Sequence, residues 1–461
     1  MMNIQNFKVA LFEKARAAGF EKFELYYPSA ESFKVNVFGG EIDEFENAYS
    51  SGVSFRGIYG GKMGYASTER VEESQIDYLL SAAKANAAVI EDKDIEPLYA
   101  GDSKYPAVDA YDETLNQTTA SEKCALAKRL EKAALECDKR VVAVDFTALG
   151  SFESEIVIAN SLGLDVSHRS NGAFAGVMVR VQEGGEEGGD PKVGFEKWAG
   201  RNLGGFSPEA LAKAAVAKGI AQLGAAKATT GQFATVFNNE TAADLFAAFS
   251  ANFFAENVQK GFSLLAGKLG QKIASPALTI RDDGYIEGGS PAAVLGSKPF
   301  DSEGVATKNK AVIENGVLKT FLYNLKAAEK DGVGSTGNGF KRGLTGPMIT
   351  GCGLFSVQPS DVSFDDVLKM AGDGILITSL DGLHAGVNAV SGDFSLSATG
   401  FAISGGLVGA PVDQMVVSGN FYEMIQNVVQ VGSDIYYDAP SGEGTFGAPC
   451  VYAGCLNISG V

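Results

Sequence analysis

Histidine, the commonest catalytic and metal-binding side chain, is scarce in this sequence. His168 and His384 are the only two among 461 residues, and they lie far apart along the chain. A catalytic zinc usually takes three protein ligands, with two histidines one helical turn apart in the common protease motif. Cys450 and Cys455 could bind a soft metal, but two buried thiols on a C-terminal strand are the simpler interpretation. The residue types therefore predict no metal site.

The apolar stretch Asn252–Pro276 is a candidate catalytic element, and it contains a single acid, Glu256. This stretch is predicted to be the end of an apolar helix followed by a glycine-punctuated loop. Glu256 is placed at that helix end, close to Lys260 and without a nearby histidine. A lone glutamate acts as a general base only on a positioned and activated water. A solvated glutamate at a helix end is therefore the preferred interpretation.

Nucleophile motifs are also weak. No Gly-x-Ser-x-Gly elbow occurs, and the glycines between Ser335 and Arg342 match neither a P-loop nor a dinucleotide fingerprint. A hydrolase site built from Asp381, His384 and Ser391 is allowed by spacing alone. It remains an alternative, and it predicts that His384→Ala abolishes turnover without unfolding the chain.

The elements that would position these residues divide into three predicted domains. Residues 1–115 are an α+β domain with a linker. It begins with a helix over Ile4–Ala18, continues as an antiparallel meander with Gly-Gly turns, and has a second helix from about Val71. Residues 116–229 are a mixed middle domain. Its helices are marked by a capping box at Thr119 and Glu122 and by a cap at Ser207.

The segment 230–461 is predicted to be a larger β-rich domain with a twisted antiparallel sheet. A helix from about Glu240 through Phe254 precedes short strands, and two hairpins turn at Asn315-Gly316 and Gly405-Gly406. Gly184–Pro191, in the middle domain, is predicted to be a flexible hairpin tip. The fold class expected for the whole chain is α+β.

Composition excludes several function classes. The net charge of −18 argues against a nucleic-acid surface, which needs clustered Lys and Arg to neutralise phosphates. No apolar run is long enough to span a membrane, and the N-terminus lacks the apolar core of a signal peptide. Five scattered cysteines give no disulfide framework. A cytoplasmic protein with free thiols is expected.

Three C-terminal stretches together resemble the TldD/PmbA family, also called TldD/TldE, which carries an older label of DNA gyrase modulator. They are Asp301–Arg342, Gly372–Gly406 and Val417–Asp434. In the TldD branch of that family, a His-Glu-x-x-x-His helix and a cysteine near the C-terminus bind a catalytic zinc. In this sequence Ala255 and Lys260 stand where the histidines belong, and Glu256 stands at the glutamate.

The resemblance therefore implies a PmbA/TldE-type subunit without the zinc motif. It implies a TldD-like zinc-bearing partner, a complex that cleaves flexible or leader peptides, and no cofactor in this chain. A homodimer in the absence of the partner and a gyrase-modulating binding protein remain alternatives. The candidate substrate contacts are Ser335, Thr336, Asn338, Arg342, His384, Asn388 and Asp393, each of which could equally be a structural loop residue.

Overall fold

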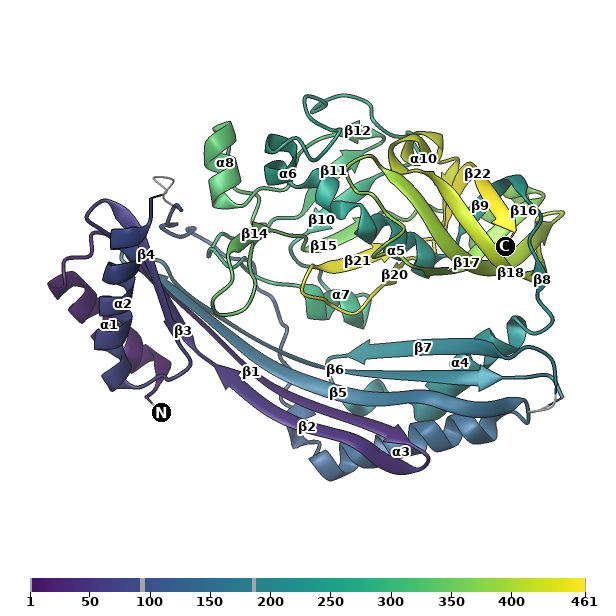
Figure 1. The fold of residues 1–461 in the computed structure, drawn as a ribbon, viewed down its shortest axis with the longest axis horizontal. Coiled ribbons are helices and arrows are strands. Elements are labelled where there is room, and N and C mark those ends of the chain that lie inside the picture. Colours follow the sequence, from purple (N-terminus) through teal and green to yellow (C-terminus); the bar gives the residue numbers. More distant parts are fainter. Residues whose placement is uncertain (1, 92–95, 185–187, 461) are drawn as a thin grey trace.

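The computed structural model describes residues 2–91, 96–184 and 188–460. A long curved sheet forms one layer, and a compact C-terminal domain lies over one of its faces (Figure 1). Helices and strands are mixed throughout, which confirms the α+β class. The predicted linker and the predicted hairpin tip each fall partly outside the described residues, at 92–95 and 185–187.

The first half of the chain contributes four helices and seven strands among the described residues. They are α1 (Ile4–Ala17), β1 (Phe23–Phe38), β2 (Glu41–Ser51), β3 (Val53–Tyr59), β4 (Lys62–Thr68), α2 (Ile76–Val89), α3 (Ala120–Cys137), β5 (Val141–Asn160), β6 (Asp165–Val181), β7 (Lys192–Gly200) and α4 (Pro208–Ala221).

All seven of these strands belong to one sheet, in the order β4-β3-β1-β5-β6-β7 with β2 also paired to β1. The pairing of β1 with β5 runs from Glu24 opposite Asn160 to Asn36 opposite Ala148. The N-terminal and middle segments therefore share a single sheet. Because more than a hundred residues separate β1 from β5, no local sequence pattern predicts that these two strands pair.

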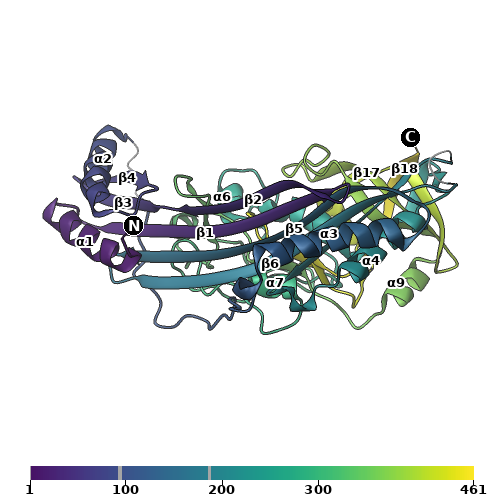
Figure 2. The same cartoon turned by 90° about the horizontal axis from the view of Figure 1, so that it is seen from below.

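Alternation along the strands gives this sheet two different faces. Odd-numbered residues such as Leu25 and Val157 pack in the apolar core against α1 and α2. Even-numbered residues such as Tyr26 and Ile158 contact Phe300 of the C-terminal domain. Figure 2 shows α3 and α4 on the side of the sheet away from that domain. One face thus holds the helices, and the other faces the C-terminal domain.

The two predicted helix starts in this half are confirmed. The amide of Thr119 donates to Glu122 Oε2 at 2.7 Å and the amide of Glu122 donates to Thr119 Oγ1 at 3.3 Å, which completes the capping box of α3. Ser207 accepts from the amide of Ala210 at 3.2 Å and caps α4. Both contacts are local, so the residue types alone specify them.

The C-terminal domain contains the remaining elements. They are β8 (Ala226–Lys227), β9 (Gly231–Phe237), α5 (Asn239–Ala248), α6 (Ala255–Gln259), β10 (Ile280–Asp283), α7 (Pro291–Gly296), β11 (Lys310–Glu314), β12 (Val317–Leu318), α8 (Leu325–Asp331), β13 (Gly339–Lys341), β14 (Met348–Thr350), β15 (Leu354–Val357), α9 (Phe364–Ala371), β16 (Gly374–Asp381), β17 (Asp393–Ser404), β18 (Leu407–Asn420), α10 (Phe421–Asn427), β19 (Gln430–Val431), β20 (Tyr436–Tyr437), β21 (Thr445–Ala448) and β22 (Val451–Gly460).

Two larger sheets organise this domain. Five strands of one sheet, β9, β16, β17, β18 and β22, pair in a closed ring, and the other sheet has the order β12-β11-β10-β15-β21-β20. Both predicted hairpins are present, and Asn315 and Gly316 have the positive φ angles, 48° and 81°, that a tight Asn-Gly turn requires. Parallel pairing occurs as well, between β9 and β16, β8 and β18, and β15 and β21. Both sheets are therefore mixed, whereas the prediction had only antiparallel strands.

The predicted helix from Glu240 to Phe254 is wrong in its second half. Helix α5 ends at Ala248, and a short 3-10 turn follows before α6 begins. The carbonyl of Phe253 accepts from the amide of Leu322 at 2.8 Å, and the amide of Ala255 donates to the Leu322 carbonyl at 2.9 Å. These two long-range hydrogen bonds hold Phe254 in an extended conformation. Glu256 consequently lies in the first turn of α6 instead of at the end of a long helix.

Among the described residues, no helix has both the length and the apolar character needed to cross a membrane.

Candidate functional site

The three positions of interest, two on α6 and one at its C-cap, have very different surroundings. Ala255 is fully buried, with its methyl group in the main core of the C-terminal domain. Glu256 is partly exposed and accepts the amide of Thr350 through Oε1 at 3.1 Å. The Lys260 ammonium lies 3.6 Å from Glu256 Oε2. The carboxylate of Glu256 thus anchors β14 to α6 and neutralises one cation.

This arrangement is a poor match to a divalent metal. The donors at the three positions are one carboxylate, already engaged by a backbone amide and an ammonium, and no neutral nitrogen. Across residues 2–91, 96–184 and 188–460, no group of three or more His, Cys, Asp or Glu side chains is arranged to hold an ion. Burial and then the nearby Asp434 carboxylate raise the pKa of the Cys450 thiol, so it stays protonated at neutral pH.

Three of the predicted contact residues lie in the turn before β13 and point inward. Ser335 Oγ donates to the carbonyl of Tyr323 at 3.0 Å, and Thr336 Oγ1 donates to Asn338 Oδ1 at 2.7 Å. Asn338 is fully buried and donates to Asp282 Oδ2 at 2.8 Å. The side chains of Ser335 and Asn338 hold this turn in place, and little of either reaches solvent.

Three others lie at the exposed loop between β16 and β17, with His384 and Asn388 in the loop and Asp393 as the first residue of β17. The Ser391 hydroxyl donates to Asp393 Oδ2 at 2.8 Å, and Asn420 Nδ2 donates to Asp393 Oδ1 at 2.9 Å. Asn388 Oδ1 accepts the amide of Ser391 at 3.1 Å. His384 is exposed, and none of the hydrogen bonds among the described residues joins its side chain to Ser391. The loop therefore links the serine to a carboxylate and leaves the histidine outside the network.

The last of them, Arg342, follows β13 and is exposed, with its guanidinium 3.5 Å from Glu443 Oε1. It borders a cleft between the long sheet and the C-terminal domain, which residue patterns alone did not predict. No hydrogen bond connects Arg342 or the turn before β13 to the His384 loop in the described part of the chain. The seven predicted residues thus fall into separate groups.

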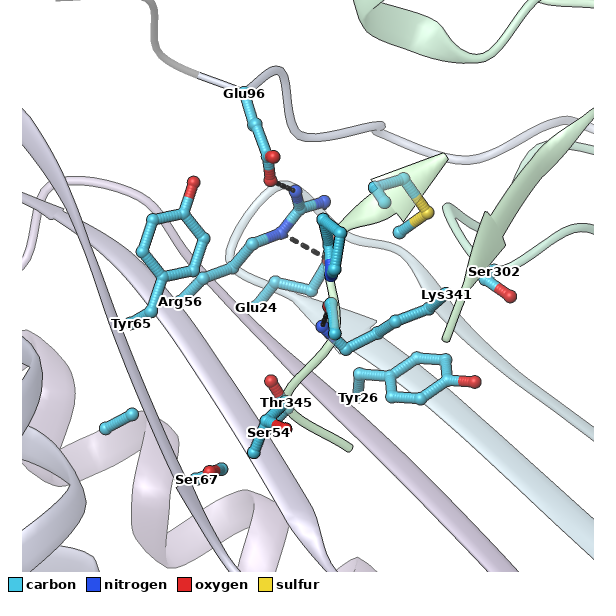
Figure 3. Close-up of a pocket in the computed structure, with 14 residues that line it drawn as sticks. Glu24, Tyr26, Ser54, Arg56, Tyr65, Ser67, Glu96, Ser302, Lys341 and Thr345 are labelled. Atoms are coloured by element: carbon cyan, nitrogen blue, oxygen red, sulfur yellow. Dashed lines mark hydrogen bonds and ion pairs between the residues drawn. The ribbon is translucent and has the colours of Figure 1, made fainter. Parts of the chain in front are cut away.

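The cleft contains a hollow of about 470 Å³ between β1, β3 and β4 on one side and the β13–β14 hairpin on the other. We call it the Arg56 hollow. Figure 3 shows Arg56 between Glu24 and Glu96, with Lys341 and Tyr26 nearby. Arg56 Nη2 lies 2.7 Å from Glu24 Oε1, and Nη1 lies 3.0 Å from Glu96 Oε2. An ionic network therefore forms one wall of the hollow.

Burial and neighbouring charges shift the pKa values of two cations in this hollow, Arg56 and Lys341. Burial alone would lower the pKa of Arg56, but the carboxylates of Glu24, Glu96 and Glu303 outweigh it and raise that pKa. Burial and then the positive charge of Arg56 lower the pKa of Lys341. One sequence signal was available for this site. Glu24 and Arg56 alternate with the buried residues Phe23 and Phe55, so both lie on the opposite face of the sheet.

Similarity to known proteins extends along most of the chain. Models of the PmbA/TldA metallopeptidase family match in three parts: domain 1 over residues 23–87, the central domain over 113–223 and the C-terminal domain over 230–460. A metalloprotease PmbA from Escherichia coli O157:H7 is 31% identical over 69% of this chain and 66% of its own length. A PmbA homolog from Haemophilus influenzae is 28% identical over 93% of this chain and 90% of its own. The match to the Escherichia coli protein thus spans slightly less than two thirds of that relative.

Solved structures extend the likeness to the whole fold. A Thermotoga maritima protein described as a proposed modulator of a DNA gyrase has a TM-score of 0.89 and 31% identity, covering 99% of this chain and 100% of that one. TldE from Thermococcus kodakarensis has a TM-score of 0.87 at 24% identity, covering 98% and 100%, which speaks for the fold alone. With three consecutive family models along its length, the chain belongs to the TldD/PmbA family.

Proposed function

We propose that this chain is a PmbA/TldE-type subunit of a two-component metalloprotease and holds no catalytic zinc itself. The observation that carries the proposal is the chemistry at the three α6 positions. A buried methyl group, an engaged carboxylate and an ammonium replace the two imidazoles and free glutamate that a zinc site of the TldD type needs. A positive Lys260 would also repel a divalent cation.

In this proposal a TldD-like partner supplies the zinc, and the complex cleaves flexible peptides, including leader peptides, in the cytoplasm. This chain contributes walls and strand edges around an extended substrate, because main-chain pairing accepts many sequences. The Arg56 hollow lies beside the exposed Arg342 and supports a role in holding a ligand. The seven predicted contact residues remain predictions within this scheme.

The test compares the chain alone with the chain co-purified with a TldD-type protein from the same genome. Metal analysis is expected to find zinc only in the complex, and hydrolysis of an unfolded protein such as casein is expected only there. Glu256→Gln in this chain should leave the activity of the complex unchanged, since the amide oxygen can still accept the Thr350 amide. Replacing the glutamate in the zinc-binding motif of the partner should abolish the activity of the complex. One zinc per chain in the isolated protein, lost in Glu256→Gln, would overturn the proposal.

Binding to gyrase is a second candidate, favoured by the description of the Thermotoga maritima relative. The net charge of −18 disfavours contact with DNA and leaves a basic protein surface as the target. An affinity pull-down from cell extract that contains a TldD-type chain but no gyrase subunit would decide against it. Size-exclusion chromatography of the same samples reports whether the isolated chain forms a homodimer.

A further inference from the structure

The cleft continues beyond the Arg56 hollow into two adjoining spaces of about 430 and 280 Å³. Both are lined by Ile156, Lys298, Ser302 and Phe340, and we call them together the Lys298 hollow. One wall comes from β5 and β6 of the long sheet. The opposite wall is the segment after α7, the end of β13 and the glycine-rich turn 442–444.

Lys298 is the central feature of this space. Its side chain is accessible to solvent within the cleft, but the surrounding walls lower the pKa of its ammonium, which lies 5.0 Å from the centroid of the Phe340 ring. None of the ion pairs among the described residues involves it. The Asp301 carboxylate favours the charged form of Lys298 without forming an ion pair with it, and its two oxygens accept the amides of Gly339 at 2.7 Å, Glu303 at 2.9 Å and Val305 at 3.0 Å.

Two further cations border the same space without a strong anionic partner. Lys341 is partly buried, and its Nζ donates to the carbonyl of Gly346 at 3.0 Å. The Arg342 guanidinium lies 3.5 Å from Glu443 Oε1, and the side chains of Arg342 and Glu443 are both mostly exposed. Three positive groups thus converge on a hollow whose acidic lining, among the described residues, is Glu443 in the larger space and Asp301 in the smaller one. This is unusual in a chain with a net charge of −18.

The remaining lining adds hydrogen-bonding groups to apolar walls. The ring of His168 packs edge-on against Phe300, and its Nε2 is buried without a hydrogen-bond partner. Burial and then Lys298 lower the pKa of His168 to about 4, so the ring is neutral at physiological pH. Ile156 and Phe340 supply apolar surface beside the Ser302 hydroxyl. One deep ammonium beside apolar walls suits a monoanion on an apolar stem, whereas phosphates favour arginine forks.

We propose that the Lys298 hollow binds a carboxylate of a peptide ligand, with Lys298 as its main ionic partner and Lys341 and Arg342 supporting. The peptide as ligand class rests on the proposed function, and the carboxylate rests on the convergence of Lys298, Lys341 and Arg342 on one space. The test distinguishes two sources of this carboxylate, the C-terminus of the peptide and an acidic side chain.

Binding to the isolated chain tests the site without any peptidase activity. The probe is a short peptide of alanine and leucine with an N-terminal uncharged coumarin dye, which carries no carboxylate, and its binding is followed by fluorescence anisotropy. It is made with a free C-terminus, with a C-terminal amide, and as the amide with one internal aspartate. A charge-assisted hydrogen bond is worth enough that the free acid or the aspartate peptide should bind about 10- to 100-fold more tightly than the plain amide.

Lys298→Met should reduce the preferred peptide to the affinity of the plain amide. Its melting temperature should not fall, because the change removes an ammonium that burial disfavours and keeps a stem that can pack on Phe340. Lys268→Met, an exposed lysine in the loop after α6, is the matched control and should bind as the unaltered chain does.

A preference for the free acid assigns the C-terminus, and a preference for the aspartate peptide assigns a side chain. Equal affinity for all three peptides, binding by none of them, or an unchanged preference in Lys298→Met would overturn the inference. None of these results bears on zinc content or on the partner, which the experiments of the proposed function measure separately.

Discussion

The pair of Glu24 and Arg56 offers the most direct test of how the Arg56 hollow is built. The side chains are only 3% and 10% exposed, and Arg56 Nη2 lies 2.7 Å from Glu24 Oε1. Replacing Arg56 by methionine keeps most of the volume and removes the charge. The remaining side-chain donor to Glu24 is then Asn160 Nδ2, 3.2 Å from Oε2. A carboxylate would be left inside the protein without its cation.

The expected loss of stability follows from leaving the Glu24 carboxylate buried without its cation. Breaking a buried pair by removing one partner typically destabilises by about 3–5 kcal/mol, because the other charge stays desolvated. Glu24→Gln removes the stranded charge. The double variant should therefore be more stable than Arg56→Met alone, and the two single effects should fail to add by about 2 kcal/mol or more.

Fluorescence of the single tryptophan, Trp198, can follow the unfolding of the long sheet. Trp198 lies on β7 and packs against Phe206 with ring centroids 5.0 Å apart, so its fluorescence in urea reports on the sheet that holds the pair. Arg129→Met is the matched control, since Arg129 pairs with Glu209 on the surface with both side chains more than half exposed, and it should have little effect. If Arg56→Met were no more destabilising than Arg129→Met, or if the double variant were additive, the ionic network would not support the cleft as described.

Three further predictions concern other parts of the molecule. The pKa of His168 is lowered to about 4 in the fold from 6.5 in the unfolded chain. Between these two pH values the unfolded state therefore binds more protons than the folded state. The free energy of unfolding should fall as the pH falls through this range, by at most about 1.4 kcal/mol per pH unit. Urea titrations should show this loss relative to His168→Phe, and parallel curves would contradict it. A methyl group at Gly64 of β4 would lie 2.0 Å from the Ala83 carbonyl oxygen of α2, so Gly64→Ala should destabilise the protein by about 1–3 kcal/mol in thermal unfolding. Gly205→Ala is the control, because its methyl group would meet nothing within 4 Å and should not lower the melting temperature. Equal melting temperatures for the two variants would show that α2 can shift freely. Brief alkylation with mass spectrometry should label the exposed Cys137 and Cys455 and spare the buried Cys352 and Cys450, and labelling of Cys450 as fast as Cys455 would show that its strand opens readily.

The features predicted correctly are those set by neighbours in the chain. The capping box needs only Thr119 and Glu122 three positions apart, and the hairpin at Asn315-Gly316 needs only two residues that tolerate positive φ. Alternation of apolar residues and the Gly-Gly turns likewise predicted an antiparallel meander, which is present as the β1–β2 and β3–β4 pairs. Each of these signals is complete within a few residues, so no knowledge of the rest of the chain is required.

The features missed depend on residues that meet only after folding. Leu322 breaks the predicted helix by hydrogen bonding to Phe253 and Ala255, and no local pattern near Phe254 announces this. Parallel pairs such as β9 with β16 are separated by more than a hundred residues. The cleft is a further case, because Tyr26 lies on β1 of the long sheet and Ser302 lies in the C-terminal domain, far away along the chain.

By itself, the sequence determined that an alanine and a lysine stand at positions 255 and 260, which the family resemblance aligns with the histidines of the TldD branch. It also determined the local helices and turns, because those form from contacts within a few residues. Tertiary structure alone decided that Glu256 anchors β14 and that Lys298, Lys341 and Arg342 converge on one space. Their convergence requires closing long loops around a common core, and the energy for that comes from burial spread over the whole domain.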